Sequence, residues 1–144
     1  IEVLFPVRVM NQKKGGKWQK VSQPLIPGYI FLYLDDETPF PLFLIKNERN
    51  AYKILRNSDF TLALRGSDEQ YAQWVYNHQG KIKPSRVLFK EGKIIKVVDG
   101  PLSDLQGKIV KVDRHHKRVH VQFNFGGQER IINLAIDDVE DTED

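Results

Sequence analysis

Basic side chains crowd one short stretch near the C-terminal end of the chain, where Arg114, His115, His116, Lys117 and Arg118 follow one another directly. Phosphate groups are bound by clustered long cations of this kind, and the guanidinium of arginine adds bidentate contacts. We therefore predict an RNA-binding site built from Lys111, Arg114, His115, His116, Lys117, Arg118 and Arg130. A basic turn that binds nothing is also common on small β domains, so a solvated turn stays open as the alternative.

Patterns for catalysis, cofactors or metals are weak or missing in this sequence. No nucleophile elbow or triad signature is present, and neither Gly15-Gly16 nor Gly126-Gly127 opens a phosphate-binding loop. His115, His116 and His120 suggest zinc, but neighbouring residues of a hairpin point to opposite faces, and a fourth ligand is missing. The chain also has no cysteine. We predict a protein that is not an enzyme and that holds no cofactor and no metal.

A second basic segment lies near the N-terminal end. Gly15-Gly16 predicts the tip of a loop or hairpin, and the residues around it are Lys13, Lys14, Lys17 and Trp18. Lysines around one indole ring are typical of a phosphate-binding arm with a stacking platform. The alternative is a solvated loop whose Trp18 folds back on the sheet.

Overall composition fits these basic segments without deciding between functions. The net charge is +3, with 40% hydrophobic and 28% charged residues, as in ordinary soluble proteins. Six of the last eight residues are acidic and hide a basic body. No apolar run approaches the ~20 residues of a membrane span, and no secretory signal opens the chain. We expect a cytoplasmic protein that does not contact a membrane.

Only strands are predicted after residue 89, and they must position the C-terminal basic residues. The expected strands are 93–98, 107–113, 118–125, 128–134 and a short one at 138–140, with a hairpin turn at Gly126-Gly127. Alternation predicts that the inner face of a small barrel carries Val110, Val112, Val119, Val121, Phe123 and Phe125.

The first two of these strands are joined by a glycine-rich connection. Asp99-Gly100-Pro101 has the residues of a tight turn, since glycine adopts positive φ freely and proline fixes the next φ. Gly107 lies between a bend and a strand, which suggests that another backbone passes too close for a Cβ.

Strands and one helix are predicted for the N-terminal half. Residues 1–9 alternate as a half-buried edge strand interrupted by Pro6, with Val3 and Phe5 on the apolar face. The run from Ile26 to Leu34 is nearly all apolar, which predicts a central strand. A short helix at 39–47 and a strand at 51–56 are expected to follow.

The strongest helix signal begins at Ser67. Ser67 and Gln70 have the spacing of a capping box, and Tyr71, Trp74, Val75 and His78 then form an amphipathic stripe that ends at Gly80. We expect Trp74 to lie in the core.

Two motifs resemble those of one family. Gly100, Pro101 and Gly107 match the turn, bend and fixed glycine of the KOW motif, and Pro27-Gly28-Tyr29-Ile30-Phe31-Leu32 resembles the corresponding strand of the NGN domain. Because both occur in the family's order, the chain is similar to NusG/Spt5 transcription factors over nearly its whole length.

This resemblance implies an α+β fold in two domains. Residues 1–78 are expected to form an NGN-like antiparallel sheet with flanking helices, in which the family's first strand and helix are absent. Residues 79–88 are expected to be a linker, and residues 89–144 a five-stranded SH3-like KOW β-barrel with an acidic tail.

The resemblance also implies partners. The NGN-like domain is expected to grip the clamp helices of the largest RNA polymerase subunit through an apolar surface matched here by Ile26, Pro27, Gly28 and Tyr29. The hairpin with Lys13, Lys14, Lys17 and Trp18 is implied to lie near upstream DNA.

Different members of the family use the KOW barrel differently. Housekeeping members engage Rho or a ribosomal protein, whereas specialised paralogues such as LoaP are antiterminators that read an RNA hairpin. The basic turn favours the second type. A structural RNA-binding protein similar to KOW-containing ribosomal proteins is the competing class, but it leaves the Pro27-Gly28-Tyr29 strand unexplained.

Overall fold

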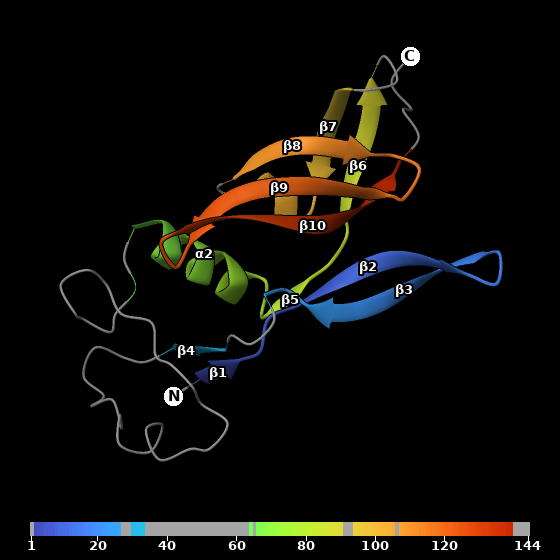
Figure 1. Ribbon diagram of the computed structural model, residues 1–144. Helices are drawn as coiled ribbons and strands as arrows, with labels where there is room; N and C mark the ends of the chain where they lie inside the picture. Colours follow the sequence, from blue (N-terminus) through green and yellow to red (C-terminus); the bar gives the residue numbers. More distant parts are fainter. Residues whose placement is uncertain are drawn as a thin grey trace.

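The computed structural model describes residues 2–26, 30–33, 64, 66–90, 94–105 and 107–139 (Figure 1). Its N-terminal module consists of β1 (Glu2–Leu4), β2 (Val7–Lys14), β3 (Lys17–Pro24), β4 (Phe31–Tyr33), α2 (Gly66–Asn77) and β5 (Lys81–Ile82). Its C-terminal sheet consists of β6 (Ser85–Lys90), β7 (Ile94–Asp99), β8 (Lys108–Asp113), β9 (Arg118–Phe125) and β10 (Gln128–Asp138), with a 3-10 turn, η1 (Pro101–Ser103). Within these residues, no helix is long and apolar enough to cross a bilayer.

The N-terminal strands form two small sheets. One has the order β3-β2-β5, and the other pairs β1 with β4. The single strand expected over residues 1–9 is divided between β1 and β2, because Pro6 has no backbone N–H to donate. The predicted hairpin is confirmed: Gly15 and Gly16 both have positive φ and connect β2 to β3.

The strand predicted over residues 26–34 is described in part, as β4, and its central position in a sheet stays a prediction, because residues 27–29 and 34 lie outside the described residues. Among the described residues β4 has three residues and pairs only with β1. Phe31 is buried by the aromatic rings of Tyr71 and Phe125 at centroid distances of 5.9 and 5.8 Å. The helix expected at 39–47 and the strand expected at 51–56 lie outside the described residues.

The predicted amphipathic helix is confirmed as α2, with Tyr71, Trp74 and Val75 buried. It begins at Gly66, so Ser67 lies inside its first turn instead of before it. It ends where expected, because Gly80 has φ +77° and donates its N–H to the carbonyl of Val75 at 2.9 Å.

The C-terminal strands form one curled sheet with the order β7-β6-β10-β9-β8 (Figure 1). The fifth strand differs from the prediction: β10 continues to Asp138, and β6 completes the sheet of the described residues. β6 pairs with β7 and, in parallel, with the end of β10. Thus β5 and the start of β6 occupy the segment expected to be a linker, while the domain division itself stays a prediction.

The inner face of this sheet follows the predicted alternation on β9, where Val119, Val121, Phe123 and Phe125 are all buried. Val110 is an exception, because it is 42% exposed. The register of β8 against β9 shifts between Ile109 and Lys111, and such a bulge turns a side chain out of the alternating pattern.

Two glycines of the KOW-like stretch are required by close packing. A Cβ on Gly100 would lie 2.6 Å from the Cα of Ser85, and Gly100 also has φ +108°. A Cβ on Gly107 would lie 2.9 Å from the Cγ1 of Val121 and 3.1 Å from the backbone oxygen of Gln122. The expectation of a close backbone neighbour at Gly107 is therefore confirmed.

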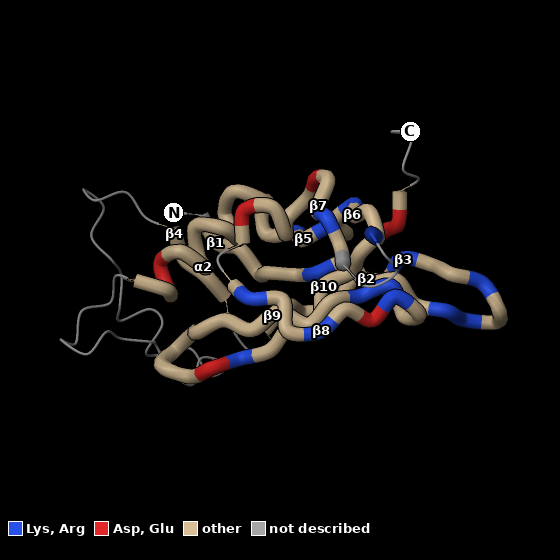
Figure 2. Tube along the Cα trace, turned by 90° about the horizontal axis from the view of Figure 1, so that it is seen from above, with Lys and Arg blue, Asp and Glu red and all other residues tan. Residues whose placement is uncertain are grey.

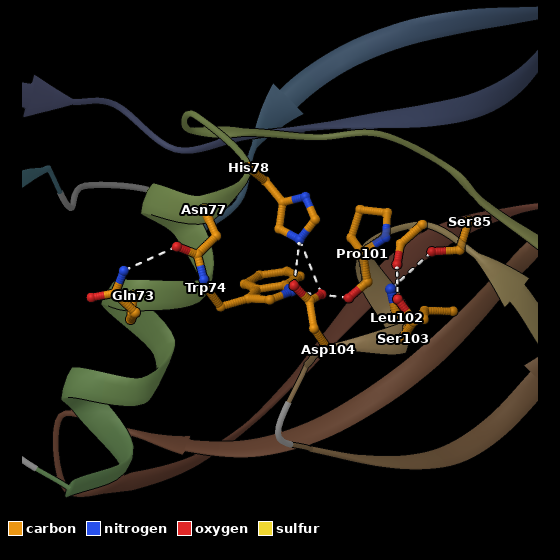
Figure 3. Close-up of polar contacts among 10 residues, drawn as sticks. Gln73, Trp74, Asn77, His78, Ser85, Pro101, Leu102, Ser103 and Asp104 are labelled. Atoms are coloured by element: carbon orange, nitrogen blue, oxygen red, sulfur yellow. Dashed lines mark hydrogen bonds and ion pairs between the residues drawn. The ribbon is translucent and has the colours of Figure 1, made fainter.

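One hydrophobic core joins the N-terminal module to the C-terminal sheet. The ring of Tyr71 in α2 stacks on Phe123 in β9, with centroids 4.8 Å apart and planes 11° apart. Figure 3 shows polar contacts at the same boundary. Trp74 donates its indole N–H to the carbonyl of Pro101 at 2.9 Å, and His78 lies 3.0 Å from a carboxylate oxygen of Asp104. The two modules are thus packed together.

Candidate nucleic-acid interface

The basic residues between β8 and β9 form a tight turn, Arg114–Lys117, which we name the basic turn. Asp113 shapes it by accepting a hydrogen bond from the backbone N–H of His116 at 3.1 Å, and its other oxygen lies 2.8 Å from His116 Nδ1. Lys117 has φ +54° and donates its N–H to the carbonyl of Arg114 at 3.2 Å. The carbonyl of Lys117 accepts a hydrogen bond from Ile136, so the turn is fixed against β10.

These hydrogen bonds hold the pKa of Asp113 below its usual range, chiefly through the backbone N–H of His116. The ionised carboxylate therefore stabilises the turn above the ordinary carboxyl range of about pH 4. This contribution should disappear as pH falls through the lowered pKa. We expect the amide resonance of His116 to titrate with a midpoint below that of an ordinary Asp in NMR. D113N should abolish the transition, and a midpoint at the ordinary value would contradict the geometry.

The side chains of the basic turn are accessible but not all free. The Arg114 guanidinium lies 4.2 Å from the ring centroid of Phe89 and 3.3 Å from a carboxylate oxygen of Asp138, and its side chain is 55% exposed. His115 and His116 do not point to opposite faces as predicted; their rings meet edge to face at 4.8 Å. The reason is that both belong to a turn, where the alternation of a strand does not apply. Across the described ranges, no His, Asp and Glu side chains gather into a group of three suited to a metal ion.

Two predicted RNA-binding arginines differ from the side chains of the basic turn, Arg118 by its burial and Arg130 by its position. Arg118 is half-buried beside Arg8, whose pKa is lowered by burial and by the nearby Arg118 charge. Arg130 donates its Nε–H to the carbonyl of Phe125 at 3.2 Å, near the opposite end of the β9–β10 hairpin. It lies five positions along β10 from Ala135, the partner of Arg118, which corresponds to ~17 Å along a strand. Lys111, by contrast, is exposed on β8.

The β2–β3 hairpin brings a second set of cations to the same end of the molecule, as Figures 1 and 2 show. Lys13, Lys14 and Lys17 are exposed, and none of them makes an ion pair with a described residue. Trp18 is 37% exposed and lies under the Nζ of Lys117, 4.7 Å from its ring centroid. The indole is therefore neither buried nor fully solvated.

The acidic end of β10 neutralises some of this charge. Asp137 pairs with Lys20 at 2.8 Å, and Asp138 pairs with Arg114. The acidic residues from Glu140 onward lie outside the described residues.

The residues predicted to bind RNA polymerase are only partly described. Ile26 is 7% exposed and belongs to the core, so it does not form an apolar surface in this conformation. Pro27, Gly28 and Tyr29 lie outside the described residues.

An exposed apolar surface that sequence reasoning missed lies next to that segment. Val3, Phe5 and Ile30 are 56, 54 and 56% exposed. Leu4 pairs with Phe31 and both pack toward the core, so alternation turns Val3 and Phe5 outward, against the prediction. Continuing the register by one residue places Phe5 opposite Ile30. We name Val3, Phe5 and Ile30 the outer apolar face.

Known proteins match this chain in two ways. The family model for the KOW motif matches residues 91–122, which include the glycine-rich connection, β8 and the basic turn. Over 96% of its length, the chain is also similar to proteins named "Transcription termination/antitermination protein NusG". The relative from Rickettsia typhi is 26% identical over 138 residues, and the match spans 71% of that relative's length. The relative from Thermus thermophilus is 27% identical over 154 residues, and the match spans 79% of its length.

The curled sheet and the motif match define a KOW-containing protein. The relatives extend the similarity across the N-terminal module, so that the chain is similar to NusG proteins over 96% of its length. The named relatives are transcription factors and not enzymes, in agreement with the prediction.

Proposed function

We propose that this protein is a transcription elongation or antitermination factor that binds RNA polymerase through its N-terminal module and nascent RNA through its basic turn. The names of its relatives support the general role, which would place it in the cytoplasm as expected. The observation that supports the proposed RNA binding is the basic turn, whose backbone is fixed by hydrogen bonds and which bears Arg114 and Lys117.

The outer apolar face is the proposed polymerase-docking surface. Its three members are more than half exposed, and Ile30 directly follows the Pro27-Gly28-Tyr29 segment that the family uses for docking. Neighbouring exposed apolar side chains on a small protein usually mark an interface. Ile26 is buried in the core and is not assigned to this surface.

The basic turn is the proposed site for RNA, and a hairpin is the form of RNA that we favour. Its backbone is held by hydrogen bonds to Asp113 and Ile136, so the Cα positions that carry its cations keep a fixed spacing. Fixed cations suit the regular phosphate spacing of a duplex stem better than a flexible single strand. This property favours the specialised, LoaP-like type of factor.

A second function is favoured by apolar side chains on the C-terminal sheet. Ile109, Val110 and Ile131 are 36, 42 and 60% exposed, which suits a barrel that recruits a protein such as Rho or a ribosomal protein. A structural RNA-binding role is less well supported, since the similarity to NusG proteins covers 96% of the chain.

Charge reversal of the basic turn tests the proposed RNA-binding function. We expect R114E/K117E to bind a hairpin RNA at least tenfold more weakly than the unchanged chain, with a shallower dependence of affinity on salt. K90E/K96E is the matched control, because it changes the charge equally at two exposed lysines of β6 and β7. Fluorescence anisotropy over a salt series, with circular dichroism to check folding, makes the measurement. Equal weak binding to every RNA by all three proteins would favour the protein-recruiting function.

A further inference from the structure

The contact between Lys117 and Trp18 joins two basic elements that are far apart in the sequence. One belongs to the basic turn of the C-terminal sheet and the other to the β2–β3 hairpin of the N-terminal module. Figure 2 shows Lys and Arg positions from both elements at one end of the molecule. Their juxtaposition depends on the packing of the two modules.

We propose that the basic turn and the side of the β2–β3 hairpin that faces the C-terminal sheet form one composite site for an RNA hairpin. Stem phosphates contact Arg114 and Lys117, and an unpaired loop base stacks on Trp18. This inference rests on the RNA-binding function proposed above. In this proposal, the β2–β3 hairpin of the protein binds the same RNA molecule as the basic turn, and it does not bind a separate DNA.

The β2–β3 register shows which side of the hairpin takes part. Lys13 lies opposite Trp18, and Asn11 lies opposite Lys20, so alternation places these four side chains on one face. Lys20 and Asn11 both contact Asp137 of β10, which identifies this face as the one turned toward the C-terminal sheet. Lys14 and Lys17 lie opposite each other on the other face.

Buried polar contacts fix the hairpin against the C-terminal sheet. Asn11 is 3% exposed and donates its Nδ2–H to the carbonyl of Ile136 at 3.0 Å, while Arg8 donates to the carbonyl of Asn133. Ile136 also donates its own N–H to Lys117, so one strand holds both the arm and the turn. The two sets of cations are therefore held at a defined separation.

The chemistry of Trp18 favours RNA with an unpaired base over duplex DNA. A base stacks on an indole only when it is free of its own duplex stack, as in a hairpin loop. Trp18 is 37% exposed, and the ammonium of the flexible Lys117 side chain lies over its ring. When the ammonium of Lys117 moves from the ring to a phosphate, the face of the indole becomes available to the base.

Lys13 and Lys14, which lie on opposite faces of the β2–β3 hairpin, provide the test. In the full chain, K13E should weaken binding of an RNA hairpin about tenfold, whereas K14E, with the same charge change, should weaken it less than threefold. W18A should weaken hairpin binding about fivefold and leave binding of a blunt RNA duplex unchanged. Anisotropy with both RNAs and with a DNA duplex measures these ratios.

The outcomes separate this inference from the proposed function. If R114E/K117E loses RNA while K13E and W18A bind normally, the turn binds RNA alone and the composite site is wrong. Equal losses in K13E and K14E, or losses limited to duplex DNA, would also overturn it. If none of these variants changes RNA binding, the proposed RNA-binding function fails as well.

Fluorescence gives an independent readout of the same site. Trp18 is 37% exposed and Trp74 only 3%, so acrylamide should quench mainly Trp18. We expect saturating hairpin RNA to protect most of this emission, and W18F to lack the protected component. Unchanged quenching in the RNA complex would contradict stacking on Trp18.

Discussion

Replacing Gly100 by alanine is expected to lower the free energy of unfolding by about 3 kcal/mol or more, through strain and steric overlap together. The added Cβ would lie 2.6 Å from the Cα and 2.8 Å from the Oγ of Ser85. Ser85 cannot move away easily, because it is 1% exposed and its Oγ accepts a hydrogen bond from the N–H of Leu102. The backbone φ of +108° adds a conformation that side chains rarely adopt.

Gly16→Ala is the matched control for this prediction. Gly16 also has positive φ, at +78°, but a Cβ there would meet nothing within 4 Å. Only backbone strain remains, so we expect a loss of about 1 kcal/mol. Urea unfolding followed by circular dichroism measures both variants. If the two glycines prove equally replaceable, the close contact between Gly100 and Ser85 is not what requires glycine.

The second large effect is expected at the outer apolar face. Burial of one Phe or Ile side chain in an interface contributes about 1.5–3 kcal/mol, and each 1.4 kcal/mol is tenfold in affinity. F5D/I30D should therefore weaken binding to RNA polymerase by about a hundredfold or more. Both side chains are more than half exposed, so the fold should be preserved. Surface-immobilised polymerase and circular dichroism provide the two measurements.

Ile131→Asp controls for the general effect of a new carboxylate on an exposed isoleucine. Ile131 is 60% exposed on β10, in the other module. We expect its polymerase binding to match that of the unchanged chain. Equal losses in I131D and F5D/I30D would indicate a nonspecific charge effect, and no loss in either would place docking elsewhere.

Regular periodicity made β9 and α2 predictable from the sequence. Apolar and polar residues alternate strictly from Val119 to Phe125, which is the pattern of a strand. Tyr71, Trp74 and Val75 recur at helical spacing, which is the pattern of a helix. The special glycines were also predictable, since Gly100 and Gly107 lie at turn and bend positions. The local sequence shows where these features lie, although the contacts that require the two glycines come from Ser85, Val121 and Gln122.

Features that depend on contacts between distant segments were not predictable. Residues 85–90 became β6 because the end of β10 pairs with them, and no local pattern in the segment shows that partner. The apolar run around Phe31 indicated a covered strand, but its covering partners, aromatic rings of α2 and β9, come from distant segments that the run does not identify.

The candidate site shows the same division. Consecutive basic residues identified the turn, but the sequence did not reveal that Arg118 lies beside Arg8 or that Lys117 covers Trp18. Alternation in residues 1–9 predicts that Val3 and Phe5 face the core, whereas both are more than half exposed. The opposite side is buried, since Leu4 packs with Phe31 beneath the sheet.

The central claim is that one chain carries separate surfaces for RNA polymerase and for RNA. Hairpin RNA fixed to beads should retain purified RNA polymerase only when this protein is added. F5D/I30D should stay on the RNA without retaining polymerase, and R114E/K117E should bind polymerase in solution without joining the beads. Polymerase retention by both variants at the level of the unchanged chain would contradict the account.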